Sequence, residues 1–206
     1  LIFPMTKRRI LIATGNPGKL REIQAVFADV PVAWCTLGDL PAMPEAVEDG
    51  ATFEANADKK ALHYASLSAL WTLADDSGLV VDALGGAPGV RSARYSPSGR
   101  DPDNNRKLVA ELAGVPQEQR TARFVCCVAL ARPGAVLARA RGTFEGQVID
   151  TPRGTNGFGY DPHFWLPELE RTSAELEPTH KNRISHRGNA LRALLPQLRT
   201  LIAENA

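Results

Sequence analysis

The chain of 206 residues is long enough for one domain with a substantial core, and we expect residues 1–206 to form that single domain. Its hydrophobic content of 44% and charged content of 23% are ordinary for a globular protein. A net charge of +1 argues against a protein that coats nucleic acid. A small anionic ligand remains possible, because it needs only a local positive pocket.

Three cysteines, Cys35, Cys126 and Cys127, follow no disulfide framework, which favours a reducing compartment. We interpret them as core residues rather than metal ligands or redox centres. No apolar run approaches the roughly 20 residues of a membrane-spanning helix. Residues 1–6 lack the layout of a signal peptide, and we expect them to be a disordered extension ahead of a start at Met5. These features predict a cytoplasmic protein with no membrane contact.

Hydrophobic periodicity and turn residues predict alternating strands and helices. We expect strands at 9–13, 32–36, 71–74, 122–131 and 135–147. We expect helices at 18–27, at 52–70, and from Asp101 as N-cap to about Gly114. A short helix should open at Thr172 by a capping box with Glu175, and a last helix should run from Ser185 with a kink or restart at Pro196. The last two strands form a hairpin around Pro133-Gly134, so the sheet cannot be wholly parallel. The expected fold is α/β with a mixed sheet.

The first chemical motif is Thr14-Gly15-Asn16-Pro17-Gly18-Lys19, between the first strand and the first helix. A helix N-terminus offers backbone N–H groups and a partial positive charge, which favour phosphate, and Lys19 adds a full charge. The motif is not a Walker loop, which has longer glycine spacing and a Ser or Thr after the Lys. The alternative is a tight strand-to-helix turn without a ligand.

The second motif is Asp75-Asp76-Ser77-Gly78, predicted to follow the end of a buried strand. Open α/β sheets bind ligands beyond the carboxyl ends of their strands. Carboxylates there suit Mg²⁺, and one of them can orient or deprotonate an attacking water. An acidic turn or helix cap without chemistry is the alternative.

The third motif is the glycine-rich segment 154–162, in which glycines flank Phe158 and Tyr160. Aromatic faces stack on bases, and Asp161 can accept a hydrogen bond from a base N–H. The fourth combines Lys181 with Ser185-His186-Arg187-Gly188, where a forked guanidinium can bind phosphate or a base oxygen. A mobile surface loop and a solvated basic helix start are the respective alternatives.

Together these segments resemble the inosine and xanthosine triphosphate pyrophosphatase family, which removes non-standard purine nucleotides. The resemblance extends from Ile10 over nearly the whole chain. It is carried in order by 13–19, 53–57, 74–79, 85–90 with 92–96, 157–162 and 184–188. Ordered motifs at compatible spacing are far more specific than any one of them.

The resemblance implies an elongated mixed sheet flanked by helices, with two lobes and a central active-site cleft. It also implies a cytoplasmic homodimer that uses Mg²⁺ and hydrolyses XTP, ITP and dITP to the monophosphate and pyrophosphate, which keeps these nucleotides out of DNA and RNA. Asp76 would be general base and metal ligand, with Glu48 as the second metal carboxylate. The residues implied for the substrate are Thr14, Gly15, Asn16, Pro17, Gly18, Lys19, Lys60, Ser77, Phe158, Gly159, Tyr160, Asp161, Lys181, His186 and Arg187.

One departure from the family pattern concerns the acidic loop. The family often has two adjacent glutamates there, whereas Val47 precedes Glu48 in this chain, so Glu45 is an alternative ligand. Asn156 stands where a small residue is frequent, and the sequence suggests no function for it.

Three other functions are compatible with parts of the pattern. A nucleotide-binding regulator would need the phosphate and base elements but not Glu48, Asp75 and Asp76. A related enzyme could act on other modified or pyrimidine triphosphates. A single-stranded nucleic-acid module could use Phe158 and Tyr160 as stacking platforms, although the near-neutral charge disfavours it.

Overall fold

The computed structural model describes residues 7–205, so the extension predicted for residues 1–6 lies outside the described part. In this part the strands are β1 (Arg9–Ile12), β2 (Ala33–Thr36), β3 (Trp71–Val81), β4 (Thr121–Arg132), β5 (Ala135–Val148), β6 (Phe164–Leu166) and β7 (Arg171–Thr172). The α-helices are α1 (Pro17–Val26), α2 (Phe53–Ser68), α3 (Asp101–Glu111), α4 (Pro178–Ile184) and α5 (His186–Glu204). None of the helices in residues 7–205 is long and apolar enough to cross a membrane.

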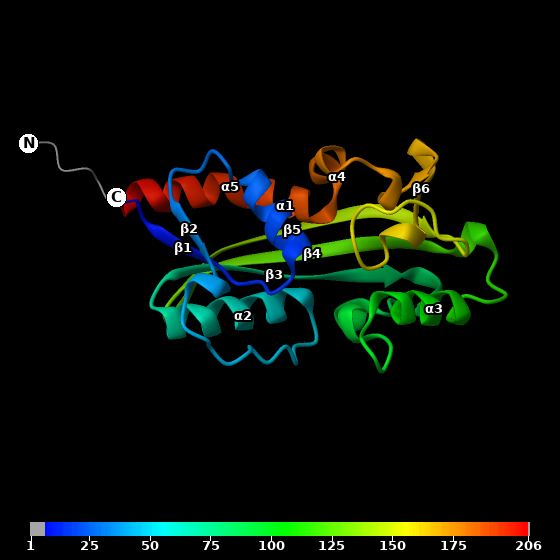
Figure 1. The fold of residues 1–206 in the computed structure, drawn as a ribbon, viewed down its shortest axis with the longest axis horizontal. Helices are drawn as coiled ribbons and strands as arrows, with labels where there is room; N and C mark the ends of the chain where they lie inside the picture. The colour runs from blue at the N-terminus through cyan, green and yellow to red at the C-terminus, as the bar shows by residue number, and fades with distance from the viewer. Residues whose placement is uncertain (1–6, 206) are drawn as a thin grey trace, which may run out of the picture. The chain divides into compact units, whose positions relative to one another are not determined.

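The strands form one mixed sheet in the order β2-β1-β3-β4-β5-β6-β7 (Figure 1). β1 pairs in parallel with β2 and β3, whereas β6 pairs antiparallel with β5 and β7. β4 and β5 are neighbours joined by Pro133 and Gly134 alone, which makes them the predicted hairpin. The α/β class with a mixed sheet is thus confirmed, whereas the central cleft stays a prediction.

The described residues form two compact units, and the expectation of a single domain stays a prediction. Unit one consists of the described parts of Leu1–Asp75, Cys127–Ala140 and Leu191–Ala206. Unit two consists of Asp76–Cys126 and Arg141–Ala190. The boundary falls inside β3, between Asp75 and Asp76, so each unit holds one of the two consecutive carboxylates.

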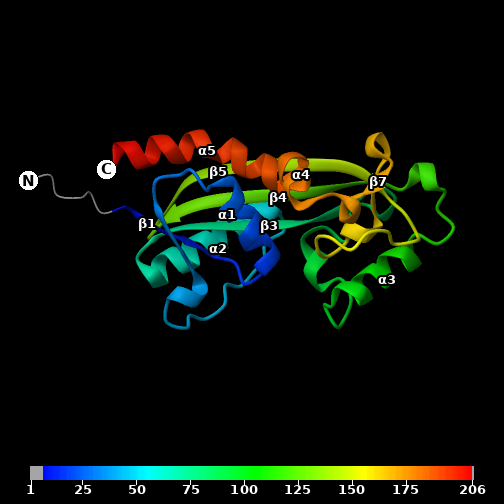
Figure 2. The ribbon, with the colours of Figure 1, turned by 45° about the horizontal axis from the view of Figure 1, so that its top comes forward.

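In unit one, α2 runs alongside the first half of β3 in two views (Figures 1 and 2). Thr52 caps this helix by accepting a hydrogen bond from Ala55 N at 3.1 Å. Ala57, Ala61 and Ala65 recur every four residues and are buried, so a narrow face of small side chains points to the core. This face lets the helix backbone pack closely.

The prediction that this strand ends at Ala74 is wrong, because β3 continues through the acidic motif to Val81. A short 3-10 helix, η3 (Gly89–Arg94), packs directly on the strand. A Cβ on Gly78 would come within 3.0 Å of Ser92 Oγ, and Ser92 Oγ accepts a hydrogen bond from Leu79 N at 2.9 Å. Ser92 thus covers the strand at Gly78 and Leu79, and the chain stays extended through a motif for which local propensity predicts a turn.

Unit two has its own apolar core, formed by Leu79, Val81, Leu108, Leu112, Ala122, Phe124, Val148, Tyr160, Phe164, Leu166 and Leu176. The capping box predicted at Thr172 is confirmed, and it opens the 3-10 helix η7 (Ser173–Glu175). α5 starts at His186 in this unit and continues through Pro196 as one helix, so no new helix begins at this proline.

Candidate active site

The first candidate motif forms the turn between β1 and α1 in unit one. Pro17 is the first residue of the helix, and the Asn16 side chain accepts hydrogen bonds from Gly18 N at 2.8 Å and Lys19 N at 3.1 Å. Two of the N–H groups expected to face a ligand are therefore capped by the protein itself. A side chain at Gly15 would meet no atom within 4 Å, so the turn is open at this point.

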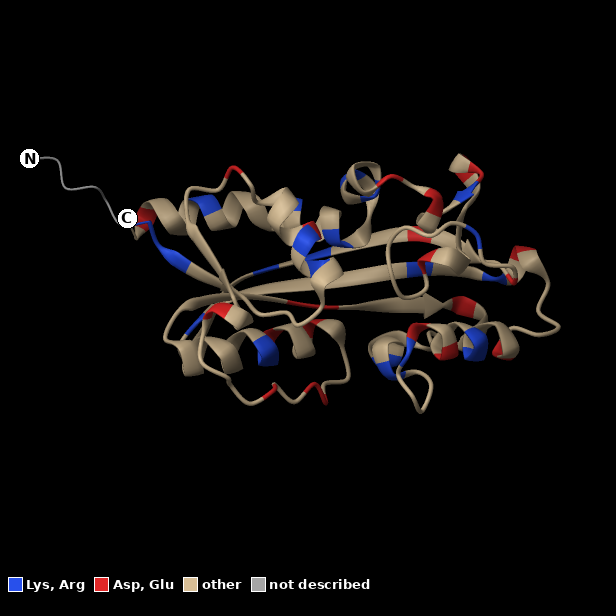
Figure 3. Ribbon diagram, in the orientation of Figure 1, with Lys and Arg blue, Asp and Glu red and all other residues tan. Residues whose placement is uncertain are grey.

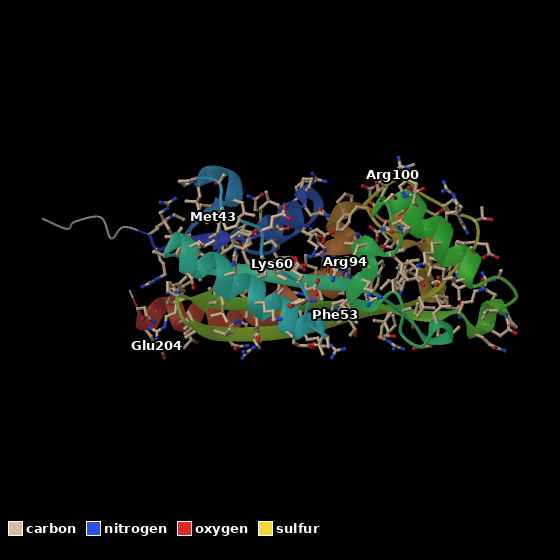
Figure 4. All side chains as sticks on the ribbon, turned by 90° about the horizontal axis from the view of Figure 1, so that it is seen from below. Met43, Phe53, Lys60, Arg94, Arg100 and Glu204 are labelled. Carbon is tan, nitrogen blue, oxygen red and sulfur yellow. The ribbon has the colours of Figure 1, made fainter. Side chains whose placement is uncertain are left out.

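Two lysines and two acidic residues of unit one form a lysine–carboxylate cluster. Lys19 Nζ lies 3.0 Å from Asp75 Oδ2, and Lys60 Nζ lies 2.8 Å from Glu48 Oε1. Lys60, on α2 (Figure 4), also donates a 3.0 Å hydrogen bond to the backbone oxygen of Asp75. The pairing offsets the desolvation of Asp75, of which only 1% is exposed.

This cluster bears on the choice between Glu48 and Glu45 as metal ligand. Glu48 is tied through Lys60 to the backbone of Asp75, whereas Glu45 is exposed. A metal–triphosphate complex carries both signs of charge, so it can bind lysines and carboxylates that neutralise each other in its absence. The described geometry favours Glu48.

In unit two, the acidic motif continues with Asp76 and Ser77. The two consecutive acidic residues of β3 form the red segment midway along the strand (Figure 3). Asp76 is 7% exposed, and its Oδ1 accepts a hydrogen bond from Ser77 N at 2.9 Å. Arg187, at the start of α5, donates a 2.8 Å hydrogen bond from Nη2 to Ser77 Oγ. Residues of the second and fourth motifs, 110 positions apart, therefore meet.

The third and fourth motifs meet around Asp161, in what we call the Asp161 network. Asp161 Oδ2 accepts hydrogen bonds from Lys181 Nζ at 2.5 Å and Phe158 N at 2.8 Å, and Oδ1 accepts one from Ser173 Oγ at 2.9 Å. The Lys181 and Arg187 cations lie 5.0 and 5.8 Å from the centroid of the Phe158 ring. A ligand that reaches this ring would also come close to two cationic donors.

Tyr160 and His186 were expected to contact the substrate, and their rings are engaged within unit two. Tyr160 is 5% exposed, belongs to the apolar core, and donates a 2.7 Å hydrogen bond to Ser92 O. Burial raises the pKa of its phenol, which keeps it a neutral donor. The His186 ring stacks on Phe124 at 4.8 Å. Of the two aromatics in the glycine-rich loop, only Phe158 presents a partly exposed ring.

Two residues of α3 that sequence reasoning did not assign to the site, Asp101 and Asn105, hold this loop, which lies beside α3 in Figure 2. Asp101 was expected to be the N-cap of the helix, but Arg100 occupies that position and Asp101 Oδ2 instead accepts from Gly159 N at 2.7 Å. Asn105 Nδ2 donates to Gly159 O at 2.9 Å. These partners lie 58 and 54 positions apart, so no local pattern could have revealed them.

A cavity of about 540 Å³ in unit two lies against the same loop. α3 contributes Asn105 and Val109 to its lining, and the loop contributes Phe158 and Gly159. The lining does not include Lys181 or Arg187. The cavity and the two cations therefore do not coincide within unit two.

The carboxylates fit a hard cation by their donor chemistry. Glu48 and Asp76 offer only oxygen ligands, which Mg²⁺ prefers. Within residues 7–205 no three His, Cys, Asp or Glu side chains gather to hold a metal ion by themselves. That is compatible with Mg²⁺, which usually keeps several waters and binds through one or two carboxylates together with substrate phosphates.

Comparison with known sequences gives relatives over nearly the full length. A family model described as the Ham1 family matches residues 10–197. The dITP/XTP pyrophosphatase of Geobacter sulfurreducens is 52% identical over 92% of this chain and 96% of its own length. The protein of the same name from Geobacillus kaustophilus is 50% identical over 95% of this chain and 96% of its own length.

Comparison with solved structures agrees. A HAM1 protein from Coxiella burnetii superposes with a TM-score of 0.83 at 40% identity, covering 96% of this chain and 99% of that one. A nucleoside-triphosphatase / dITP/XTP pyrophosphatase from Mycobacterium abscessus gives a TM-score of 0.74 at 45% identity, covering 91% and 99%. These relatives and the family model cover both compact units. The chain belongs to the Ham1 family.

Proposed function

We propose that this protein hydrolyses deaminated purine nucleoside triphosphates, namely XTP, ITP and dITP, to the monophosphate and pyrophosphate. Removal of these nucleotides would limit their incorporation into DNA and RNA. The proposal is supported by the names of the relatives, dITP/XTP pyrophosphatase, at about half of all positions identical. It is supported independently by the chemistry of the two groups of side chains.

One observation carries the proposal above the others: consecutive residues of β3 belong to two chemically different groups. Asp75 pairs with Lys19 beside the glycine turn, in a group suited to phosphates. Asp76 precedes Ser77, which binds Arg187, and that arginine lies over Phe158 in a group suited to a base. We assign the triphosphate to the first group and the base to the second.

Mg²⁺ would be held by Glu48 and Asp76, and when bound it would offset negative charge on the phosphate oxygens. Asp76 accepts the proton of a water, and the water oxygen forms a bond to the α-phosphorus. The bond between the α-phosphorus and the bridging oxygen then breaks, and the pyrophosphate leaves with the electron pair. Lys19 and Lys60 stabilise the charge on the leaving group.

Base selectivity would come from the purine 6-position. Inosine and xanthosine carry an oxygen there, which accepts hydrogen bonds, whereas adenine carries an amino group. Lys181 and Arg187 are donors without acceptor capacity, so an adenine amino group next to them would lose its partner. Such an unpaired buried group can reduce kcat/KM by up to about 10⁴-fold.

The first test follows the water oxygen. The purified protein is incubated with ITP and Mg²⁺ in water enriched in oxygen-18, with ATP and GTP in parallel. We expect IMP and pyrophosphate, with the label in IMP and little turnover of ATP or GTP. Label in pyrophosphate would place the attack on the β-phosphorus and overturn the assigned step. Orthophosphate with IDP would overturn the reaction itself, and tight binding without turnover would favour a regulator.

The second test concerns the general base. Asp76→Asn keeps the size of the side chain but lowers its basicity, so kcat should fall by at least about 10²-fold while thermal unfolding changes little. Asp82→Asn is the matched control, because Asp82 follows the same strand but is exposed and pairs with Arg123. An Asp76→Asn variant with wild-type kcat would remove Asp76 from the mechanism.

A cytoplasmic location and a homodimer belong to the same proposal. Cys35, Cys126 and Cys127 are all free thiols, as expected for a reducing compartment. The resemblance to the family implies the dimer, and analytical ultracentrifugation of the purified chain tests it. A sedimentation mass close to 22.2 kDa at micromolar concentration would contradict the dimer.

A further inference from the structure

We propose that Ser173, on η7, is a positioning residue that sets base selectivity through the Asp161 network. The inference rests on the proposed function, because it assumes that Lys181 recognises the purine 6-oxo group. Ser173 donates a 2.9 Å hydrogen bond to Asp161 Oδ1, while Asp161 Oδ2 binds the Lys181 ammonium at 2.5 Å. The serine thus acts on the proposed base contact through one intervening carboxylate.

Because the Ser173 hydroxyl and its partners are buried, its removal should have a large effect on the Asp161 network. Ser173 is 0% exposed, Asp161 2% and Lys181 4%, so water cannot readily replace a lost partner. A buried carboxylate must be satisfied at both oxygens, because an unpaired one carries its full desolvation penalty. Without the hydroxyl of Ser173, we expect Asp161 to turn toward other donors and to carry Lys181 with it.

The same carboxylate also shapes the loop that carries the aromatic ring. Asp161 Oδ2 accepts from Phe158 N at 2.8 Å, closing a turn in which Gly157 has φ +79°. A Cβ on Gly157 would fall within 3.0 Å of this oxygen, so the chain leaves the carboxylate no room to shift in that direction. Ser173 therefore fixes Lys181 and the Phe158 backbone together.

η7 is itself held rigidly, so Ser173 can serve as a reference point. Thr172 N donates to Glu175 Oε2 at 2.7 Å within the capping box. Asn156 N donates to Ala174 O at 2.9 Å, and Asn156 Nδ2 donates to Leu176 O at 3.0 Å. Two hydrogen bonds from Asn156 thus fasten the glycine-rich loop to this turn, which gives Asn156 a structural role.

The test compares Ser173→Ala with Thr172→Val. Both remove one fully buried hydroxyl at this turn. That of Thr172 binds the Arg153 carbonyl at 2.7 Å and takes part in the capping box rather than in the Asp161 network, so Thr172→Val shows what loosening η7 alone does. We expect Ser173→Ala to lower kcat/KM for ITP about tenfold, mainly through KM, because it deletes a hydrogen bond to a charged group. The value for ATP should stay unchanged, so the ITP-to-ATP preference falls by the same factor.

Two further variants make the test specific. In a Lys181→Ala background, Ser173→Ala should change the ITP-to-ATP preference no further, because of the two groups that Asp161 positions, Lys181 and Phe158, only Lys181 discriminates between the bases. If Ser173→Ala does not fold, Ser173→Cys carries the same test, since a thiol is a weaker donor of similar size. The ITP-to-ATP preference of Ser173→Cys should lie between that of the wild type and that of Ser173→Ala.

The outcomes separate this inference from the proposed function. Equal loss of preference in Ser173→Ala and Thr172→Val would show a merely structural role and overturn the inference. A further loss in the Lys181→Ala background would overturn the route through Lys181. If the wild type does not prefer ITP, or if Lys181→Ala keeps the full preference, the proposed base recognition fails, whatever Ser173 does.

Discussion

Substituting Gly157 tests the Asp161 network by stability rather than by activity. Gly157 and Gly159 both have positive φ, +79° and +62°, so alanine at either site is strained by about 1 kcal/mol. Their surroundings differ. A Cβ at Gly157 would come within 3.0 Å of Asp161 Oδ2, whereas at Gly159 nothing lies within 4 Å. Gly159→Ala is therefore a matched control for backbone strain.

The clash between the new methyl group and Asp161 determines how much the free energy of unfolding falls in Gly157→Ala. Asp161 can yield to the new methyl group only by loosening its bonds to Lys181 and to Phe158 N. Breaking a buried ion pair costs about 3–5 kcal/mol, because both charges stay buried. We therefore expect Gly157→Ala to lower the free energy of unfolding by about 4 kcal/mol or more, and Gly159→Ala by about 1 kcal/mol.

The assay is equilibrium unfolding in urea, followed by circular dichroism and by tryptophan fluorescence, whose agreement checks for a single transition. In an Asp161→Ala background the ion pair is already lost, so Gly157→Ala should cost there only the backbone strain of about 1 kcal/mol. Equal destabilisation by Gly157→Ala and Gly159→Ala would refute the reasoning, because it would mean that Asp161 yields without cost.

Two further predictions concern single side chains. Lys60→Met should lower kcat/KM for ITP at least tenfold, because it removes the cation, bound to the Asp75 carbonyl, that we assign to stabilise the leaving pyrophosphate. Lys59→Met loses only an exposed ion pair and should leave steady-state kinetics unchanged. Backbone hydrogen bonding from Thr172, followed by the charge of Arg153, holds the pKa of Glu175 below its ordinary value of 4.5. Its contribution to stability is therefore present above that value and lost as pH falls through the lowered pKa. In urea titrations the stability advantage of the wild type over Glu175→Gln should shrink as the pH is taken below 4.5, and it should not grow.

Much of the fold follows from local patterns in the sequence. A long segment rich in Ala and Leu predicts α2, and Pro133-Gly134 between two apolar runs predicts the hairpin of β4 and β5. Each depends on neighbours along the chain, and each is confirmed within a few residues. The capping box at Thr172 is confirmed for the same reason, since its two partners are three residues apart.

The candidate site could be predicted only in part. Motif spacing identified Asp161, Lys181 and Arg187, which the structure brings into one unit, and their roles toward substrate stay predictions. Ser173 and Asn105 could not be found, because a buried serine and a helical asparagine have no signal apart from distant partners. Tyr160 was expected to stack on a base, but in the structure its ring lies in the apolar core.

The largest error of sequence reasoning falls on β3, and its cause is physical. Asp, Ser and Gly are poor strand residues, so Asp75-Asp76-Ser77-Gly78 predicts a turn. The strand continues because partners far along the chain compensate three of these four residues: Lys19 pairs with Asp75, Arg187 binds Ser77, and Ser92 closes over Gly78. Natural sequences break local rules mainly at functional sites, where other interactions offset the cost. A turn-forming motif held inside a strand is therefore what the proposed catalytic role of Asp76 leads us to expect.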